Sequence, residues 1–179
     1  NASESLDWFP VSQATADVVN RAQQISQLTD GAFDITVQPL VALWHFSKDK
    51  SDSPQIPTTA EIKKTLNRIG YQKLTVRLTP PALKKSIPDL QIDLSAIAKG
   101  YAVDQVASRL RSQSIDNFLV EVGGEVRAAG QKADEQPWKV GIEKPVSQSR
   151  EPYQIVELKN QSLASSGDYR NFFEVDGKR

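Results

Sequence analysis

DLSAIAKGYAVDQ, residues 93–105, opens the segment on which the prediction of the fold depends. Asp93 and Ser95 are residue types that cap helix N-termini, because their side-chain oxygens accept hydrogen bonds from the first unpaired backbone N–H groups. Apolar residues then recur at every fourth position as far as residue 110, which is the spacing of one helix face. We therefore predict a helix over residues 95–111, with a buried face formed by Ala98, Ala102, Val106 and Leu110.

The start of this predicted helix also carries residues suited to binding. Asp93, Ala96 and Lys99 recur every third residue, and Gly100 follows the lysine. A helix N-terminus offers unpaired backbone N–H groups and the positive end of the helix dipole, so it favours anions such as phosphate. A lysine one to two turns further along can reach an anion bound there. An ordinary capped helix with a solvent-exposed Lys99 explains the same residues, and the pattern alone leaves both interpretations open.

The rest of the chain predicts helices early and strands late. Ser12 is a suitable N-cap for a helix that ends near Leu28, and Thr58 with Glu61 has the spacing of a capping box that opens another helix. Alternating apolar residues predict strands at KLTVRL (73–78) and LQIDL (90–94), separated by a Pro80-Pro81 turn, and later at FLVEV (118–122), EVRAA (125–129), WKVGIE (138–143), YQIVEL (153–158), SLASS (162–166) and NFFEV (171–175). The expected class is α+β: a single domain, residues 1–179, with one mixed, largely antiparallel sheet flanked by helices.

The composition excludes several kinds of site. The 22 basic residues balance the 22 acidic ones, so charge favours neither a nucleic-acid partner nor an anionic membrane surface. The absence of cysteine excludes disulfides, thiolate metal sites and a cysteine nucleophile. The single histidine, His45, lies between Trp44 and Phe46, where packing is a better explanation than a zinc site or a catalytic triad. Binding of Mg²⁺ through oxygen ligands remains open.

Three further segments combine residue types of binding sites with those of turns. In TDGAFDIT (29–36), either Asp30 or Asp34 could contact ligand hydroxyls and Phe33 an aromatic ring, but acids that cap turns and phenylalanines in cores are the commoner explanation. In VEVGGEVRAAG (120–130), the glycine pair permits close approach of a ligand or a tight turn between strands. SLASSGDYRNFF (162–173) could hold a phosphate or form a serine-rich bend, through Ser165, Ser166, Gly167 and Arg170.

The sequence is expected to be part of a longer protein. It begins at Asn1 and contains no methionine, which is consistent with an export signal or a lipid attachment site upstream. Near the other end, Asp176-Gly177 is a two-residue hairpin signal, and no returning strand follows it. We therefore expect the domain to be incomplete at both ends.

Five segments, taken together and in this order, resemble the FAD:protein FMN transferase family, the ApbE family: TDGAFDITVQPLVALWHF, DLSAIAKGYAVDQVA, VEVGGEVRAAG, WKVGIEKP and SSGDYRNFFEVDGKR. The Asp-x-x-Ala-x-x-Lys-Gly core and the Gly-Ala-Phe-Asp segment are together specific, and the resemblance spans nearly the whole chain. It implies an ApbE-like fold related to the T-fold, and binding of FAD and Mg²⁺. A protein of this family transfers the FMN half of FAD to a threonine or serine hydroxyl of a target protein and releases AMP.

The resemblance also implies roles for particular residues. FAD would be contacted by Ala32, Phe33, Asp34, Asp93 and Lys99, and Mg²⁺ by an oxygen of Ala96. The family continues beyond Arg179 into a His-x-x-Asp-Pro segment with further metal ligands and acid–base chemistry, so no catalytic residue is assigned on this chain. Gln38 stands where the family usually has glycine, and Ser95 where it often does.

Partners and location are implied in the same way. The acceptor would be a protein such as the flavin-carrying subunit of a membrane redox complex. The protein would be exported to the periplasm and held at the bacterial inner membrane by a lipid anchor upstream of Asn1. Two alternatives remain open on the sequence: a Mg²⁺-dependent FAD pyrophosphatase that yields FMN and AMP, and a flavin-binding protein without turnover.

Overall fold

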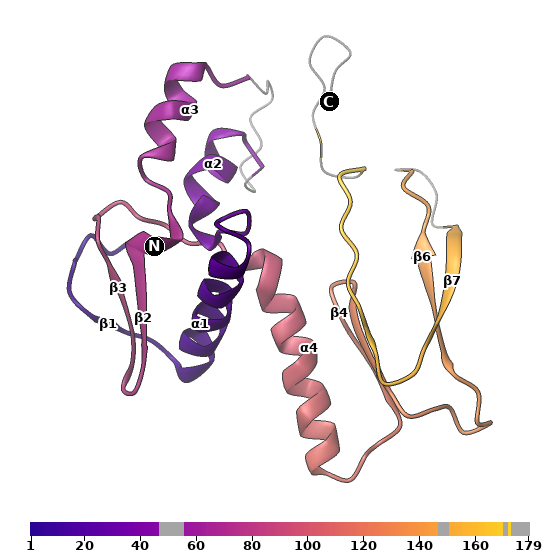
Figure 1. The fold of residues 1–179 in the computed structure, drawn as a ribbon. Helices are drawn as coiled ribbons and strands as arrows, with labels where there is room; N and C mark the ends of the chain where they lie inside the picture. The colour runs from indigo at the N-terminus through magenta and orange to yellow at the C-terminus, as the bar shows by residue number, and fades with distance from the viewer. Residues whose placement is uncertain (47–55, 147–150, 170–171, 173–179) are drawn as a thin grey trace. The chain divides into compact units, whose positions relative to one another are not determined.

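A computed structural model of the chain describes residues 1–46, 56–146, 151–169 and 172 (Figure 1). The chain divides into two compact units, Asn1–Ile97 and Ala98–Arg179, and each unit is described by itself. The α+β class is confirmed, because both units combine helix with antiparallel sheet. All strand pairs of the described residues are antiparallel and form three sheets, where one mixed sheet was expected.

The first unit contains helices and a three-stranded sheet of order β1-β3-β2. Its strands are β1 (Phe9–Pro10), β2 (Leu74–Leu78) and β3 (Pro81–Lys85). Its helices are α1 (Gln13–Leu28), α2 (Gln38–Leu43), α3 (Thr59–Leu66) and the short 3₁₀ helices η1 (Ile35–Val37) and η2 (Tyr71–Lys73). Helix α1 lies against β2 and β3 (Figure 1). The core of the unit is formed by Val19, Ala22, Ile35, Leu74 and Leu90.

The predicted helix caps of this unit are confirmed. The Ser12 side chain accepts a hydrogen bond from the backbone N–H of Thr15 (3.1 Å), and α1 begins at the next residue after the cap. At α3, the Thr58 hydroxyl accepts from the Glu61 backbone N–H (3.2 Å), while the Glu61 carboxylate accepts from the Thr58 backbone N–H (2.8 Å). Hydrogen bonds from the Thr58 side chain and backbone to this carboxylate lower the pKa of Glu61 below its usual value.

The prediction of a strand at LQIDL, residues 90–94, is wrong. The strand that pairs with β2 is β3, which starts at Pro81, the second residue of the predicted turn. The backbone of residues 90–94 is bonded to loops instead. Ile92 exchanges two hydrogen bonds with the Asn1 side chain (both 2.9 Å), and the Asp93 N–H donates to the Ile35 carbonyl (2.7 Å). The alternating apolar residues are explained by packing, since Leu90, Ile92 and Leu94 all contact the core of the unit.

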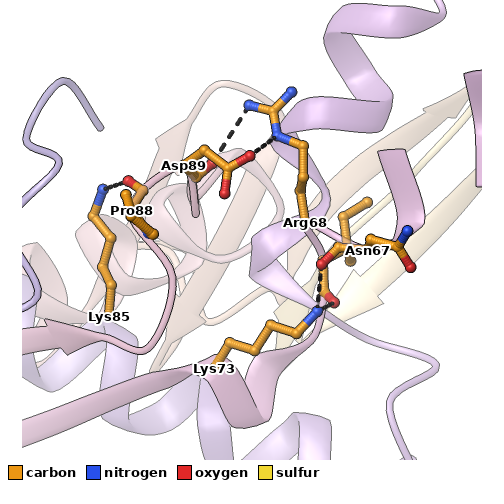
Figure 2. A network of polar contacts seen from close by, with 7 residues as sticks. Asn67, Arg68, Lys73, Lys85, Pro88 and Asp89 are labelled. Carbon is orange, nitrogen blue, oxygen red and sulfur yellow. Dashed lines mark hydrogen bonds and ion pairs between the residues drawn. The ribbon is translucent and has the colours of Figure 1, made fainter. Parts of the chain in front are cut away.

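Basic side chains form hydrogen bonds and an ion pair with the loops before β2 and after β3 (Figure 2). The Lys73 ammonium donates to the carbonyls of Asn67 and Ile69 (2.7 Å each), which lie just beyond the last turn of α3. Arg68 pairs with Asp89, with 2.6 Å between Nε and Oδ2. The Lys73 bonds connect the end of α3 to the residue before β2, and the Arg68–Asp89 pair connects it to the loop after β3.

The second unit begins within α4 (Ser95–Ser112) and continues as strands. One sheet has the order β4-β5-β8, formed by Phe118–Val122, Glu125–Ala129 and Ser162–Leu163. The other is a hairpin of β6 (Trp138–Glu143) and β7 (Pro152–Leu158). The predicted strands at FLVEV, EVRAA, WKVGIE and YQIVEL are therefore confirmed, and SLASS is a strand only over its first two residues. The prediction at NFFEV and the Asp176-Gly177 hairpin lie outside the described residues, apart from Phe172.

The predicted buried face of α4 is wrong by part of a turn. Val103 and Ala107 are the buried residues of the helix, and Leu110 packs against the same cluster, whereas Ala98 and Val106 are exposed. A strict four-residue repeat drifts around a helix with 3.6 residues per turn, so Ala98 and Leu110 cannot lie on one narrow face. Spacings of four and three, as in Val103, Ala107 and Leu110, follow the buried face correctly. None of the helices in the described residues has the length and apolar character needed to cross a membrane.

Replacing Gly130 with alanine is expected to destabilise the protein by about 2–3 kcal/mol, from a left-handed backbone and overpacking. Gly130 has φ +57°, and a Cβ atom there would lie 2.8 Å from the Asp116 carbonyl oxygen and against Asn117 Oδ1. Gly100→Ala is the matched control, because Gly100 lies inside α4 with nothing within 4 Å of an added Cβ. The control should stabilise by about 0.5–1 kcal/mol. Urea unfolding measures both, and equal effects at the two glycines would contradict this description.

Candidate functional site

The GAFDIT segment is held in place by the carboxylate of Asp34. Its Oδ1 accepts hydrogen bonds from the Thr36 backbone N–H and hydroxyl (2.7 Å each), and its Oδ2 accepts from the Tyr71 backbone N–H (2.8 Å). Thr36 is fully buried, and its hydroxyl oxygen accepts from the Gly70 N–H (2.8 Å). The interpretation of Asp34 as a turn-capping acid is therefore confirmed. Its role toward FAD stays a prediction.

Ala32 and Phe33 occupy the turn just before Asp34. Ala32 is exposed, and Phe33 is half-buried, with its ring against the core of the first unit. The Thr29 hydroxyl accepts from the Phe33 backbone N–H (3.1 Å), and Gly31, with φ +79°, makes the turn between them. The phenylalanine thus helps to close the core and still leaves part of its surface accessible.

Asp93 lies beside this turn. Its backbone N–H donates to the Ile35 carbonyl, so the two segments that sequence analysis singled out separately are directly bonded to each other in the first unit. The Asp93 Oδ1 accepts from the Ser95 N–H (2.8 Å) and hydroxyl (2.5 Å), which caps the start of α4. Its Oδ2 has no hydrogen bond in the described part of the chain. Ala96, in the first turn of α4, is exposed.

If α4 were only an ordinary capped helix, Lys99 would be expected to extend freely into solvent. In the structure its side chain makes contacts within the chain instead. Its ammonium donates to the Gly123 carbonyl (3.1 Å) and to Glu125 Oε1 (3.0 Å) in the second unit. Gly123 and Gly124 form the tight turn between β4 and β5, with φ of +57° and +92°. The interpretation of the glycine pair as a tight turn is therefore confirmed, and the turn also lets the Lys99 side chain approach the backbone closely. Close approach of a ligand stays a prediction.

A hollow of about 1120 Å³ lies in the second unit, next to the same turn. Gly124 and Glu121 line it on one side, and the strands β6 and β7 contribute Val140, Ile142 and Tyr153. Ser165, Ser166 and Gly167 also line it, so the serine-rich segment does face a concave surface. Arg170, the cation expected beside these serines, lies outside the described residues.

Glu125 is the member of the site that sequence analysis missed. It directly follows the glycine pair, and it was seen only as part of a strand. Nothing in a single sequence links it to Lys99, 26 residues earlier, because the contact depends on how α4 packs against β4 and β5. The pairing of Asp34 with Tyr71 was missed for the same reason.

Comparison with known proteins places this geometry in a family. The sequence pattern of the ApbE family matches residues 1–179. The chain belongs to the ApbE family. It is 43% identical over 181 residues to the FAD:protein FMN transferase of Salmonella typhimurium, and 44% identical over 179 residues to that of Vibrio cholerae. Both alignments cover all of this chain, which spans about half the length of these relatives (51% and 53%).

Solved structures of ApbE proteins share the fold. The flavin transferase ApbE of Vibrio cholerae is 41% identical, with a TM-score of 0.80 over 96% of this chain and 54% of its own. The ApbE protein of Thermotoga maritima is 33% identical, with a TM-score of 0.82 over 96% of this chain and 54% of its own. The resemblance of the five sequence segments to this family is thereby confirmed.

Replacing Asp34 with alanine should lower the free energy of unfolding by about 2–3 kcal/mol, because the donors of Thr36 and Tyr71 lose a charged acceptor. Asp17→Ala is the control, since among the described residues the Asp17 carboxylate accepts a hydrogen bond only from the Gln13 side chain (2.9 Å) within α1. The control should change stability by less than about 0.5 kcal/mol. Urea unfolding followed by tryptophan fluorescence measures both variants, and equal stabilities would show that Asp34 does not hold the segment.

Proposed function

We propose that the protein containing this chain is an FAD:protein FMN transferase, which moves the FMN half of FAD to a threonine or serine hydroxyl of a target protein. The observation that carries the proposal is the similarity to relatives of that name, which runs through the whole chain and so includes every candidate site segment. In the reaction, the hydroxyl oxygen attacks the FMN phosphorus. The bond between that phosphorus and the AMP oxygen breaks, AMP leaves, and the hydroxyl loses its proton.

FAD is proposed to contact Ala32, Phe33, Asp34, Asp93 and Lys99. The exposed Ala32 and the accessible part of Phe33 offer a surface for an aromatic ring system. Lys99 offers a cation for the diphosphate, whose charge increases on the leaving phosphate as the P–O bond breaks. The carboxylates of Asp34 and Asp93 already accept hydrogen bonds from the backbone N–H groups of Tyr71 and Ser95, which fixes their orientation before a ligand arrives.

Mg²⁺ is proposed to bind through an oxygen of Ala96. The residues present fit such an ion, because Ala96 is exposed at the start of α4 and the nearby Asp93 Oδ2 makes no hydrogen bond in the described residues. Mg²⁺ needs only one or two protein oxygens when substrate phosphates and water supply the others. A bound Mg²⁺ neutralises charge on the phosphates. We place the protein in the periplasm, attached to the inner membrane through an upstream lipid anchor, with a flavin-carrying subunit of a membrane redox complex as its acceptor.

The test is incubation of the intact protein with FAD, Mg²⁺ and a threonine-containing acceptor domain from such a subunit, followed by mass spectrometry of the acceptor. A mass increase equal to phosphoester-linked FMN, equimolar AMP, and loss of both with a chelator are expected. Free FMN and AMP with an unmodified acceptor would favour the pyrophosphatase. FAD that binds and is not consumed would favour the flavin-binding protein without turnover.

Lys99→Ala should lower kcat/KM for FAD by about a hundredfold, which is the scale of losing one charge-stabilising donor. Lys139→Ala is the matched control, because Lys139 also pairs with a glutamate (3.4 Å from Glu157) but lies on the exposed face of β6. The control should keep the wild-type kcat/KM. A folded Lys99→Ala protein with normal FAD affinity and turnover would remove Lys99 from the site.

A further inference from the structure

We propose that Glu125 is a positioning residue, which holds the Lys99 ammonium in place over the Gly123-Gly124 turn for an anionic phosphate ligand. The inference rests on the proposed function, in which Lys99 contacts FAD. It adds a residue that neither the sequence motifs nor the resemblance to the family singled out. Three observations in the second unit support it.

The first observation is the geometry around the ammonium. A lysine ammonium has three N–H donors, and Lys99 directs two of them to the Gly123 carbonyl (3.1 Å) and to Glu125 Oε1 (3.0 Å). The described contacts leave the third donor for a ligand. The lysine side chain is 43% exposed, so an anion can reach the ammonium from solvent.

The second observation is the shape of the turn. An added Cβ at Gly123 would lie 2.9 Å from Lys99 Cδ, so only glycine lets the lysine stem lie across the backbone at this point. The positive φ of Gly123 also favours glycine. Because the turn accommodates this one side chain so closely, Lys99 has a defined path from α4 to the start of β5.

The third observation is the burial of Glu125. Its side chain is 16% exposed, whereas the acids in the other ion pairs of the described residues are all more than half exposed. A carboxylate with this little access to water needs a charged partner, and Lys99 supplies it. The attraction is mutual: the nearly buried acid fixes the flexible four-carbon stem of the lysine, which would otherwise sample many rotamers.

The pair is not what holds α4 against the sheet. Ala107 of the helix packs with Phe118 and Ala129 in a small core, and Arg127 on β5 pairs with Asp104 of the helix (3.6 Å). These contacts remain when Glu125 is changed. A substitution there is therefore expected to loosen Lys99 and to leave the unit folded.

If Glu125 positions the Lys99 ammonium, its removal should change the kinetics in a different way than general damage to the binding site would. The Glu125 carboxylate partly neutralises Lys99, so its removal should not weaken the attraction of a phosphate in the ground state. It should instead leave the ammonium poorly placed when charge develops on the leaving phosphate. Loss of positioning thus appears in kcat, whereas general damage to the binding site would raise KM.

The experiment compares Glu125→Gln, which keeps the size and removes the charge, with Lys99→Ala and with the double variant, in the intact protein with FAD, Mg²⁺ and acceptor. We expect E125Q to lower kcat about tenfold while KM for FAD does not rise. The double variant should match Lys99→Ala, since Glu125 acts only through the lysine. Glu157→Gln, which breaks the exposed Lys139–Glu157 pair, should match the wild type. Wild-type kcat in E125Q, or a further loss in the double variant, would overturn the inference.

A second readout does not depend on turnover. NMR relaxation of the Lys99 side-chain Cε should show greater mobility in E125Q than in the wild type, and unchanged mobility would overturn the inference even if no FAD is consumed. The outcomes also separate the two proposals. If Lys99→Ala has normal FAD turnover, the proposed role of Lys99 is wrong. If Lys99→Ala is impaired and E125Q is not, only the role of Glu125 is wrong.

Discussion

The hydrogen bonds accepted by Asp34 are the constraint on which the first unit's candidate site depends. The backbone N–H groups of Gly70 and Tyr71 lie at the start of η2, where the first residues of a helix have no acceptor within that helix. Backbone donors shielded from water need such acceptors. Asp34 and Thr36 provide them from 34 or more residues away in the chain. The turn that carries Phe33 and the connection that leads into β2 are therefore held to each other by these hydrogen bonds.

The bond from Asp93 to Ile35 extends this constraint to the start of α4. Because Ile35 is 2% exposed and belongs to the core, its carbonyl is a fixed point to which the segment before α4 is attached. The Asp93 side chain then caps the helix, so one residue sets both the position and the direction of the first turn. The residues of the Asp-x-x-Ala-x-x-Lys-Gly motif that face a ligand in our proposal thus begin from a backbone fixed by packing.

The sequence correctly predicted the helix caps and the tight turn, because these features depend on interactions between residues close together in the chain. The caps at Ser12 and Thr58 are bonds between residues three apart, and the tight turn at Gly123-Gly124 is made by the two glycines themselves. Each was correct. LQIDL has the alternation of a strand, but its backbone donors are taken by Asn1 and Ile35, and no periodicity reveals that.

Contacts between residues far apart in the chain account for the other differences between the predictions and the structure. Lys99 and Glu125 are 26 residues apart, and Asp34 and Tyr71 are 37 apart, so the sequence showed both members of each pair and not the pair. The buried face of α4 depends on Phe118 and Ala129 of the neighbouring strands, which select Ala107 rather than Val106. The family resemblance was confirmed for the chain, and the roles it implies for the motif residues stay predictions. It could not say which of them act through contacts within the chain.

Whether a motif residue contacts the ligand or acts through contacts within the chain decides how loss of activity in a variant should be interpreted. Asp34 and Asp93 each carry structural hydrogen bonds, so an inactive Asp34 or Asp93 variant would not by itself identify a ligand of FAD. Lys99 and Glu125 differ, because the small core at Ala107 and the Arg127–Asp104 pair keep α4 against the sheet without them. A kinetic change at these two residues with unchanged stability therefore reports on the ligand. Variants at these two residues therefore test the chemistry of the site more directly than variants at Asp34 or Asp93.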